Sequence, residues 1–375
     1  MEKTRRIRKQ KELVALEKKG TVLVQKKDSA LIQKGLADLD GLGSRPRIDT
    51  LLQLGAGHYA RGHYRKAFQV FATVLKKDKT VGDAIEGAGF SAFQQGRFSL
   101  AQSLLRRIPG RFSGAAFCTG QGMEMVYVEG GSFAMGGSPE EMELARQAEV
   151  ETMPRLKDTK GKVPGDMDRI RRTLHPHRVT LSPFFLSRTC VPNALFEEFQ
   201  SDHFSVLTDL GGPENPAITT WEKATAFCQW LSRREGRLYR LPTEAEWEYV
   251  ARGWPSIRES AGKWSLPGIE PNRETFADMR GVVYQWCLDY YADDYYARSP
   301  ARDPFGPEEG KAHSVRGGAF FCWDDNTCLF PWNRSESDLW DFDLLFGPSL
   351  CTDLVGLRLV CVCDRAPGFL SRSGG

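Results

Sequence analysis

Cysteine and histidine are the residues of this chain best suited to metal or redox chemistry, and their spacing limits what they can do. The nine cysteines include no C-x-x-C pair and the six histidines are scattered, so the ligand spacing of a structural zinc site is missing. An odd number of cysteines spread over a long chain favours buried thiols over a disulfide framework. Any metal site must therefore be assembled by the fold. The cysteines are Cys118, Cys190, Cys228, Cys287, Cys322, Cys328, Cys351, Cys361 and Cys363.

A second chemically distinctive set of residues lies in 320–355, where the composition changes abruptly. This segment has no Lys, Gln, Met or Ile, and its seven acidic residues accompany one Arg. Its aromatic, aspartate and leucine side chains follow neither a helical nor an alternating order. Aromatic and polar groups on a rigid frame are typical of a binding surface. The predicted ligand-binding residues are Phe321, Trp323, Asp324, Asp325, Asn326, Trp332, Trp340, Phe342, Asp343, Leu345 and Phe346.

The alternative is that these aromatics belong to a hydrophobic core. We assign about half of them to the core, beginning with Phe320 and Leu329. The remainder would still form an exposed apolar patch large enough to require a ligand. The segment 320–355 is therefore predicted to be a variable ligand-binding surface.

The elements that must position this segment are predicted within residues 120–365. Residues 125–136 alternate in polarity and are interrupted by a Gly-Gly turn, which predicts two short strands. Residues 177–186 predict another strand, and a helix is predicted to begin within 191–199. The stretch therefore mixes strands and helices, which indicates an α+β domain.

Two further helices follow in the same stretch. Residues 221–232 place Ala224, Phe227, Cys228 and Leu231 on one helical face. In the following helix Thr243 and Glu246 predict a capping box, which also explains the paired carboxylates of Glu244 and Glu246.

These blocks, in this order, resemble the formylglycine-generating-enzyme family (sulfatase-modifying factors). The most specific block is Arg-Leu-Pro-Thr-Glu-Ala-Glu-Trp-Glu-Tyr at residues 240–249. The resemblance covers residues 120–365 and implies a variant of the C-type lectin fold. It does not by itself imply an activity, because one fold serves many functions.

The resemblance implies one enzymatic alternative, a copper-dependent oxidase that converts a substrate cysteine to formylglycine. The family's oxidases hold Cu(I) with two cysteines after a Gly-Gly-Ser turn, and Cys322 and Cys328 follow the corresponding turn here. Their spacing is one residue longer than in the oxidases, and Ala319 replaces the serine. Acidic neighbours such as Asp324 and Asp325 would raise the pKa of the thiols and oppose copper binding. We therefore expect no copper and no catalytic residue.

A second landmark of the family is also altered. The block that the family associates with a structural calcium site stands here as Gly-Val-Val-Tyr-Gln-Trp at residues 281–286. Val282 replaces a carbonyl-bearing Asn and Gln285 replaces a carboxylate, so two oxygen ligands for a hard cation are missing. The scaffold is predicted to be kept without the metal.

The flanks of 320–355 resemble those of variable proteins of diversity-generating retroelements, which use the same fold. In those proteins an Arg-Gly-Gly turn precedes the varied stretch and a closing strand follows it. Here the corresponding residues are 316–318 and 356–360. Asparagine codons ending in C, when randomised at adenines, yield Phe, Leu, Cys, Asp, Ser, Pro and Thr but not Lys, Gln, Met, Glu or Trp. The bias of the segment fits most of that list, so Glu336 and the three tryptophans must come from other codons.

Residues 51–115 contain an internal repeat with a period of 34 residues. Gly55, Gly62, Tyr64, Ala67 and Phe71 recur as Gly89, Gly96, Phe98, Ala101 and Leu105. The repeat resembles tetratricopeptide repeats, in which small residues let two helices approach. Two copies are too few for a free-standing solenoid, so the repeats are predicted either to pack on the following domain or to bind a protein partner.

The remaining predictions concern charge and location. Residues 1–50 form a basic arm and linker, with a net charge of +7 over 1–35, whereas the whole chain carries only +3. That total is too small to indicate a nucleic-acid partner. No apolar stretch is long enough for a membrane span or a signal peptide, so we predict a cytoplasmic protein with a flexible tail at 366–375.

Overall fold

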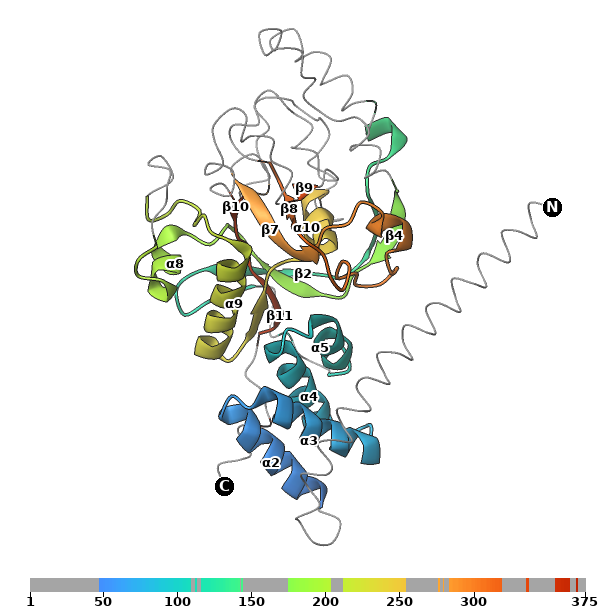
Figure 1. Cartoon of the computed structure of the whole chain (residues 1–375), viewed down its shortest axis with the longest axis vertical. Coiled ribbons are helices and arrows are strands. Elements are labelled where there is room, and N and C mark those ends of the chain that lie inside the picture. The colour runs from blue at the N-terminus through green and yellow to red at the C-terminus, as the bar shows by residue number, and fades with distance from the viewer. Residues whose placement is uncertain are drawn as a thin grey trace, which may run out of the picture. The chain divides into compact units, whose positions relative to one another are not determined.

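The structure is a computed structural model that describes residues 47–108, 112, 116–141, 143, 175–203, 212–253, 276, 279, 283–318, 335–336, 355–364 and 369. The chain divides into two compact units (Figure 1). Unit 1 comprises Met1–Gly110 and Pro367–Gly375, and unit 2 comprises Arg111–Ala366. No helix among the described residues is long and apolar enough to cross a membrane.

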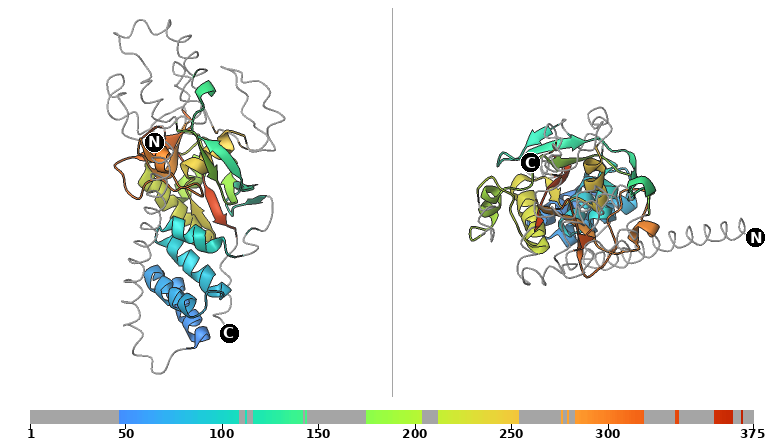
Figure 2. Two further views of the ribbon diagram at one scale, coloured as in Figure 1. Left: turned by 90° about the vertical axis from the view of Figure 1, so that its right-hand side faces the viewer. Right: turned by 90° about the horizontal axis from the view of Figure 1, so that it is seen from above.

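Unit 1 consists of consecutive helices joined by short turns, which place neighbouring helices side by side (Figure 2). Each helix buries an apolar face; in α3 the buried set is Ala67, Val70, Phe71, Thr73 and Val74. The helices are α2 (Ile48–Ala60), α3 (Tyr64–Lys77), α4 (Gly82–Gln94) and α5 (Phe98–Leu105).

The predicted repeat is visible in the backbone. Gly62 and Gly96, which are equivalent in the two copies, have φ angles of 75° and 74°, and each lies in the turn before a helix. This left-handed conformation favours glycine. Each copy is therefore a helix–turn–helix unit, while its membership of the tetratricopeptide class stays a prediction.

Close helix packing repeats as well. A Cβ atom on Gly55 would lie 2.7 Å from the ring of Phe71, and one on Gly89 would lie 2.8 Å from the side chain of Leu105. Both distances are too short for an ordinary contact, so glycine is required at both positions. The equivalent residues of the two copies thus make equivalent contacts, as the period of 34 predicts.

The one described residue of the predicted flexible tail packs within this unit. Phe369 is 3% exposed and packs against rings of unit 1. The burial of Phe369 was not predicted, and the rest of the predicted tail lies outside the described residues. The physical reason is that aromatic residues of the helices provide an apolar site that the local sequence around 369 does not reveal.

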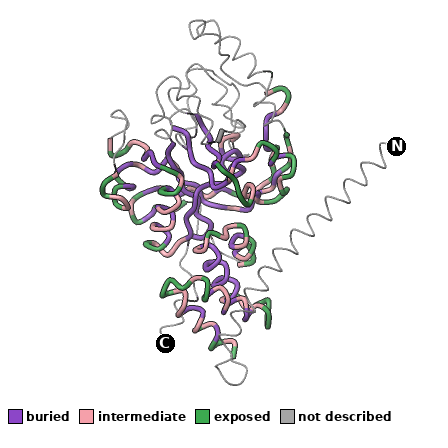
Figure 3. Tube along the Cα trace, viewed as in Figure 1, coloured by how far each residue is buried: buried purple, intermediate pink, exposed green. Residues whose placement is uncertain are grey.

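Unit 2 is built on a five-stranded antiparallel sheet with the order β1-β2-β5-β11-β6. Buried residues gather along the strands β5, β11 and β6, whereas β1 has no buried residue (Figure 3). The strands are β1 (Ala116–Cys118), β2 (Glu124–Val128), β5 (Phe184–Ser187), β11 (Val360–Cys363) and β6 (Leu238–Arg240).

The described part of unit 2 contains two smaller sheets as well. One has the order β10-β7-β8-β9 and the other pairs β3 with β4. Their strands are β10 (Val355–Gly356), β7 (Tyr284–Tyr290), β8 (His313–Arg316), β9 (Ser335–Glu336), β3 (Ser132–Met135) and β4 (His177–Thr180).

Two strands predicted as continuous are each divided between sheets. The predicted strand 177–186 forms β4, which pairs with β3, and β5, which pairs with β2 and β11. Pro183 lies at the break, where it cannot donate a ladder hydrogen bond. The predicted closing strand 356–360 is likewise divided, because Gly356 ends β10 and Val360 begins β11.

Three helices of unit 2, α8, α9 and α10, lie where the sequence predicts them, whereas α11 was not predicted. In α9, Ala224, Phe227, Cys228 and Leu231 are buried as predicted. The capping box of Thr243 and Glu246 at the start of α10 is present in both directions. The helices are α8 (Asn193–Phe199), α9 (Trp221–Glu235), α10 (Glu244–Ala251) and α11 (Tyr295–Arg298). The α+β class with an all-α N-terminal region is thus confirmed, while the C-type lectin assignment stays a prediction.

Candidate ligand-binding site: the frame around residues 320–355

The two ends of the segment 320–355 lie on either side of one strand. β8 leads into the segment and β10 leads out of it, and both pair with β7. Gln285 of β7 is the register partner of Arg316 on one side and of Gly356 on the other. Because neighbouring strands are about 4.8 Å apart, the entry and the exit are separated by about 10 Å. The end of β8 and the start of β10 therefore both lie at the amino end of β7.

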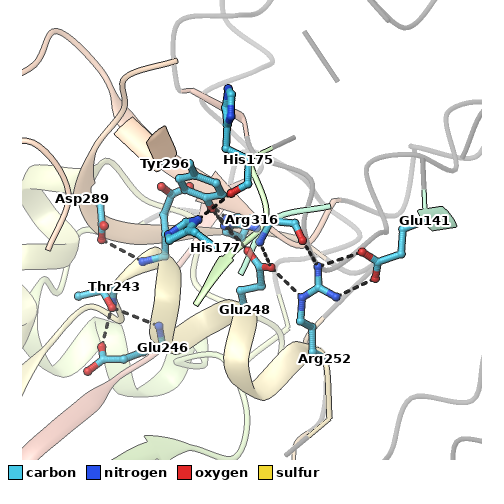
Figure 4. Close-up of polar contacts among 12 residues, drawn as sticks. Glu141, His175, His177, Thr243, Glu246, Glu248, Arg252, Asp289, Tyr296 and Arg316 are labelled. Carbon is cyan, nitrogen blue, oxygen red and sulfur yellow. Dashed lines mark hydrogen bonds and ion pairs between the residues drawn. The ribbon is translucent and has the colours of Figure 1, made fainter. Parts of the chain in front are cut away.

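Arg316, the last residue of β8, is completely buried and held by two carboxylates of α10. Its Nε lies 3.1 Å from Glu244 Oε1, and its Nη2 lies 3.0 Å from Glu248 Oε2. Nη2 also donates to the hydroxyl of Tyr296 (Figure 4). Burial opposes the charge of Arg316, but Tyr296, Glu244 and Glu248 raise the pKa of the guanidinium above its ordinary value. The entry to the segment is thus fixed by a permanently charged, fully paired side chain.

Glu248 also connects Arg316 to Gly136, the residue that follows β3. Its Oε1 accepts hydrogen bonds from the main-chain N–H of Gly136 at 2.8 Å and from Arg252 Nε at 2.7 Å. Arg252 in turn contacts Glu141, 2.7 Å away, so it lies between two carboxylates (Figure 4). The charges of Arg316 and Arg252 together offset that of the completely buried Glu248.

Arg358 fixes the other end of the segment in a similar way. It is fully buried, and its Nη1 donates to the main-chain oxygens of Ser187 at 2.7 Å and Arg188 at 2.8 Å. Its Nε donates to Gln285 Oε1 at 3.1 Å. Arg358, which lies between β10 and β11, therefore ties the chain after the segment both to β5 and to β7.

Gln285 connects the two buried arginines that anchor the ends of the segment, Arg316 and Arg358. Its Oε1 accepts from Trp247 Nε1 at 2.9 Å as well as from Arg358, and its Nε2 donates to the main-chain oxygen of Met279 at 3.4 Å. The Trp247 ring lies under the guanidinium of Arg316, with 5.7 Å from Cζ to the ring centroid. From the sequence, Gln285 was predicted only to replace a calcium-binding carboxylate. We name the connected set Arg316, Glu244, Glu248, Tyr296, Trp247, Gln285 and Arg358 the polar frame.

Glycine is required where the segment begins. Gly317 has a φ angle of 100°, and a Cβ atom there would lie 2.8 Å from the Met279 oxygen and 3.2 Å from the Trp247 ring. Gly318 also has a positive φ, of 66°. The Arg-Gly-Gly turn thus combines a buried anchor with a backbone that only glycine adopts readily.

All of the predicted ligand-binding residues, and the alternative pair Cys322 and Cys328, lie outside the described residues. Within 320–355 the structure describes only the backbone of Ser335–Glu336, which pairs with Ser314 and Val315, and Val355 of β10. The flanks of the site were predicted from the sequence, whereas the contacts of the polar frame were not. The one local signal was the i, i+4 spacing of Glu244 and Glu248, which places both on one face of α10.

The described residues offer no metal cluster of three or more His, Cys, Asp or Glu side chains. Among the described cysteines, Cys118 is exposed and Cys190, Cys228, Cys287, Cys361 and Cys363 are buried free thiols. Burial raises the pKa of the Cys228 and Cys361 thiols, which keeps them protonated and unreactive.

The scaffold that carries the polar frame has recognisable relatives. Residues 115–265 match the family model of the sulfatase-modifying factor enzyme 1-like domain. The formylglycine-generating enzyme of Streptomyces coelicolor is 32% identical over 146 residues, which cover 30% of this chain and 45% of that protein. The serine/threonine-protein kinase pkn1 of Chlamydia pneumoniae is 29% identical over 304 residues, which cover 67% of this chain and 43% of that protein. The chain spans less than half the length of these curated relatives.

Two solved structures are similar to about two thirds of this chain. PvdO from Pseudomonas aeruginosa has 21% identity and a TM-score of 0.44, and the match covers 67% of this chain and 98% of that chain. Treponema denticola variable protein 1 has 19% identity and a TM-score of 0.43, and the match covers 66% of this chain and 98% of that chain.

Proposed function

We propose that this chain, whose sulfatase-modifying factor enzyme 1-like domain follows a helical N-terminal region, is a noncatalytic ligand-binding protein. Its binding surface is the segment 320–355, and its ligand is a protein or another macromolecule. In its most specific form, the proposal makes the chain the variable protein of a diversity-generating retroelement located in the cytoplasm. The codons of the segment would then be rewritten while the polar frame is kept.

The observation that carries the proposal is the position of the two ends of the segment beside Gln285. Closing a loop costs less conformational entropy when its ends are held close together by a rigid scaffold. Every side chain of the polar frame lies outside 320–355, so substitutions within the segment leave the anchors in place. This arrangement suits a surface whose sequence changes and whose fold does not.

The chemistry of the segment supports a binding surface rather than a merely solvated one. Aromatic side chains supply large contact areas at low conformational cost, and aspartates supply hydrogen-bond acceptors and charge. The predicted residues include Trp323, Trp332 and Trp340 together with Asp324 and Asp343. Such a surface fits a ligand with donor groups around an apolar centre.

A substitution experiment separates a binding surface from a hydrophobic core. Replacing Trp323, Trp340 and Phe342 together by Ser should lower the free energy of unfolding by less than about 1 kcal/mol if these side chains are on the surface. Urea unfolding measures the change. A loss of several kcal/mol would place the three side chains in the core and contradict the proposed surface.

The retroelement form of the proposal has a genomic test. The gene neighbourhood should contain a near-copy of the codons for 320–355 beside a reverse transcriptase, with differences concentrated at adenines. If both are absent, the retroelement is ruled out and a ligand-binding domain without diversification remains.

A copper-dependent formylglycine-generating oxidase that uses Cys322 and Cys328 is the second candidate. The specific observation in its favour is the 32% identity to the formylglycine-generating enzyme of Streptomyces coelicolor. Against it, the family-model match ends at residue 265, before either cysteine. The match therefore supports the scaffold and says nothing of the thiols that would hold copper.

Copper binding distinguishes the two candidates. The oxidase requires one Cu(I) per chain, lost on Cys322→Ser, together with oxygen-dependent oxidation of a cysteine-containing peptide. Cys351→Ser is the matched control, because Cys351 lies in the same segment but outside the pair. Stoichiometric Cu(I) binding that survives Cys351→Ser and disappears with Cys322→Ser, with turnover, would overturn the binding-protein proposal.

A further inference from the structure

The ring of Phe369 occupies an aromatic site within unit 1. Its centroid lies 5.3 Å from that of Tyr59, 5.1 Å from that of Phe71 and 6.2 Å from that of Phe90, in edge-to-face geometry. The three rings come from the successive helices α2, α3 and α4. Edge-to-face pairs at these distances stabilise more than burial of their area alone. We name Tyr59, Phe71 and Phe90 the aromatic socket.

The repeat itself fixes the aromatic socket. Phe71 is completely buried against Gly55 and Gly87, where Cβ atoms would lie 2.7 Å and 2.4 Å from its ring. Phe90 is also completely buried, and the half-buried Tyr59 is braced by the ring of Tyr64 at 5.2 Å. The contacts of Phe71 with Gly55 and Gly87, and of Tyr59 with Tyr64, are made between residues of the helices themselves. Contacts among the helices therefore help to shape the socket, as is usual for a binding pocket.

The residue in the socket reaches it from far along the chain. Phe369 follows the last strand of unit 2 by six residues, yet it belongs to the same compact unit as α2 to α4. Two repeats are too few to bury an apolar face alone. The phenyl ring supplies apolar contact that a further repeat would otherwise provide.

We propose that the aromatic socket is a peptide-binding site for a phenylalanine-bearing segment, and that the chain's own C-terminal segment is its resident ligand. The proposal is independent of the function proposed for 320–355. Tethering gives Phe369 an effective concentration in the millimolar range, so a free peptide competes poorly while Phe369 is present. Removing the phenyl ring opens the socket to a peptide in trans.

The test uses the full chain and a fluorescein-labelled peptide with the sequence of residues 365–375. Fluorescence anisotropy should show saturable binding to the Phe369→Ala chain and at least tenfold weaker binding to the wild-type chain. The same peptide with Ala in place of Phe should not bind. Adding Tyr59→Ala to Phe369→Ala should weaken binding at least fivefold, because the half-buried Tyr59 contributes one of the three rings.

A second measurement covers the case in which Phe369→Ala unfolds unit 1. The peptide should then restore the helical circular dichroism signal of the variant in a saturable manner, whereas the Ala-containing peptide should not. The proposal is overturned if the folded variant shows no saturable binding, if both peptides act equally, or if an unfolded variant is not refolded by the Phe-containing peptide.

Discussion

In unit 1 a missing side chain makes room for a neighbour, whereas in unit 2 buried charges hold distant strands together. Gly55 and Gly89 admit Phe71 and Leu105, so helix packing follows from shape alone. The polar frame instead joins Arg316 and Arg358 to α10 and β7 through directed hydrogen bonds. Apolar packing tolerates small adjustments, but a buried charge that loses its partner has no alternative in the protein interior. The two units should therefore respond differently to single substitutions.

The chain provides a convenient way to follow unit 2. All nine tryptophans lie between Trp221 and Trp340, so tryptophan fluorescence during urea unfolding reports on unit 2. Hydrogen exchange of the amides in α2 to α4 reports on unit 1.

Breaking the charge network should have the largest effect. Arg316→Met keeps an unbranched apolar stem but removes the guanidinium, so Glu244 and Glu248 stay buried with a lost partner. We expect unit 2 to lose about 3–5 kcal/mol, measured by tryptophan fluorescence.

The matched control is Arg298→Met, which removes an ion pair with Asp294 whose side chains are 54% and 72% exposed. It should change the free energy of unfolding by less than about 1 kcal/mol. Equal effects of the two substitutions would show that the polar frame does not hold unit 2.

Removing the connection between the anchors should have a smaller effect. Gln285→Met deprives Trp247 Nε1 and Arg358 Nε of their acceptor, but Arg358 keeps two main-chain oxygens. We expect a loss of about 1–3 kcal/mol by the same measurement, because buried donors are left unsatisfied. Gln229→Met, at a half-buried position of α9, is the control and should be near neutral. A Gln285→Met chain as stable as the control would remove Gln285 from the polar frame.

The apolar side of the comparison is tested by two glycines of one helix. Gly55→Ala places a Cβ atom against the Phe71 ring, so overpacking should outweigh the gain in helix propensity and destabilise unit 1 by about 1–2 kcal/mol. Gly57→Ala meets only Arg61 Nη1 at 3.6 Å and should stabilise α2 by about 0.5–1 kcal/mol. Amide exchange in α2 to α4 should move in opposite directions in the two variants. Equal changes would mean that the helices adjust to the added methyl group.

The smallest effect concerns pH. His313 lies between Trp221 and Tyr290, with ring centroids 3.6 Å and 4.3 Å away, and burial lowers its pKa below the ordinary value of 6.5. The unfolded chain therefore binds this proton first, so the contribution of His313 to stability is present above pH 6.5 and is lost as the pH falls below it. His313→Phe keeps an aromatic ring in the stack and should flatten the decline of unit 2 stability between pH 7.5 and about 5. Superimposable pH profiles would contradict this role.

The parts of the fold that follow from local sequence were predictable. The 34-residue repeat, the buried face of α9 and the capping box of α10 each depend on residues within one or two helical turns, or on a period visible along the chain. The division of 177–186 and of 356–360 between two sheets was not, because a strand pattern does not specify its partner. The C-terminal packing of Phe369 was missed for the same reason.

In the candidate site, too, some features were predictable from the sequence and others were not. Its flanks at 316–318 and 356–360 were identified from the sequence, whereas the residues predicted to bind the ligand lie outside the described part of the chain. Glu244 was explained only as a helix-start residue, and the structure adds its ion pair with Arg316, 72 residues away in the sequence. Gln285 was interpreted as a lost ligand, and it is the residue beside which both flanks meet.

By itself, the sequence determined the class of the scaffold, the repeat and the boundaries of an unusual segment, because composition, periodicity and capping are properties of neighbouring residues. Only the tertiary structure decided that the two ends of that segment meet at β7 and that two buried arginines hold them there. A buried charge needs a partner wherever the fold can supply one, and nothing in the local sequence says how far along the chain that partner lies.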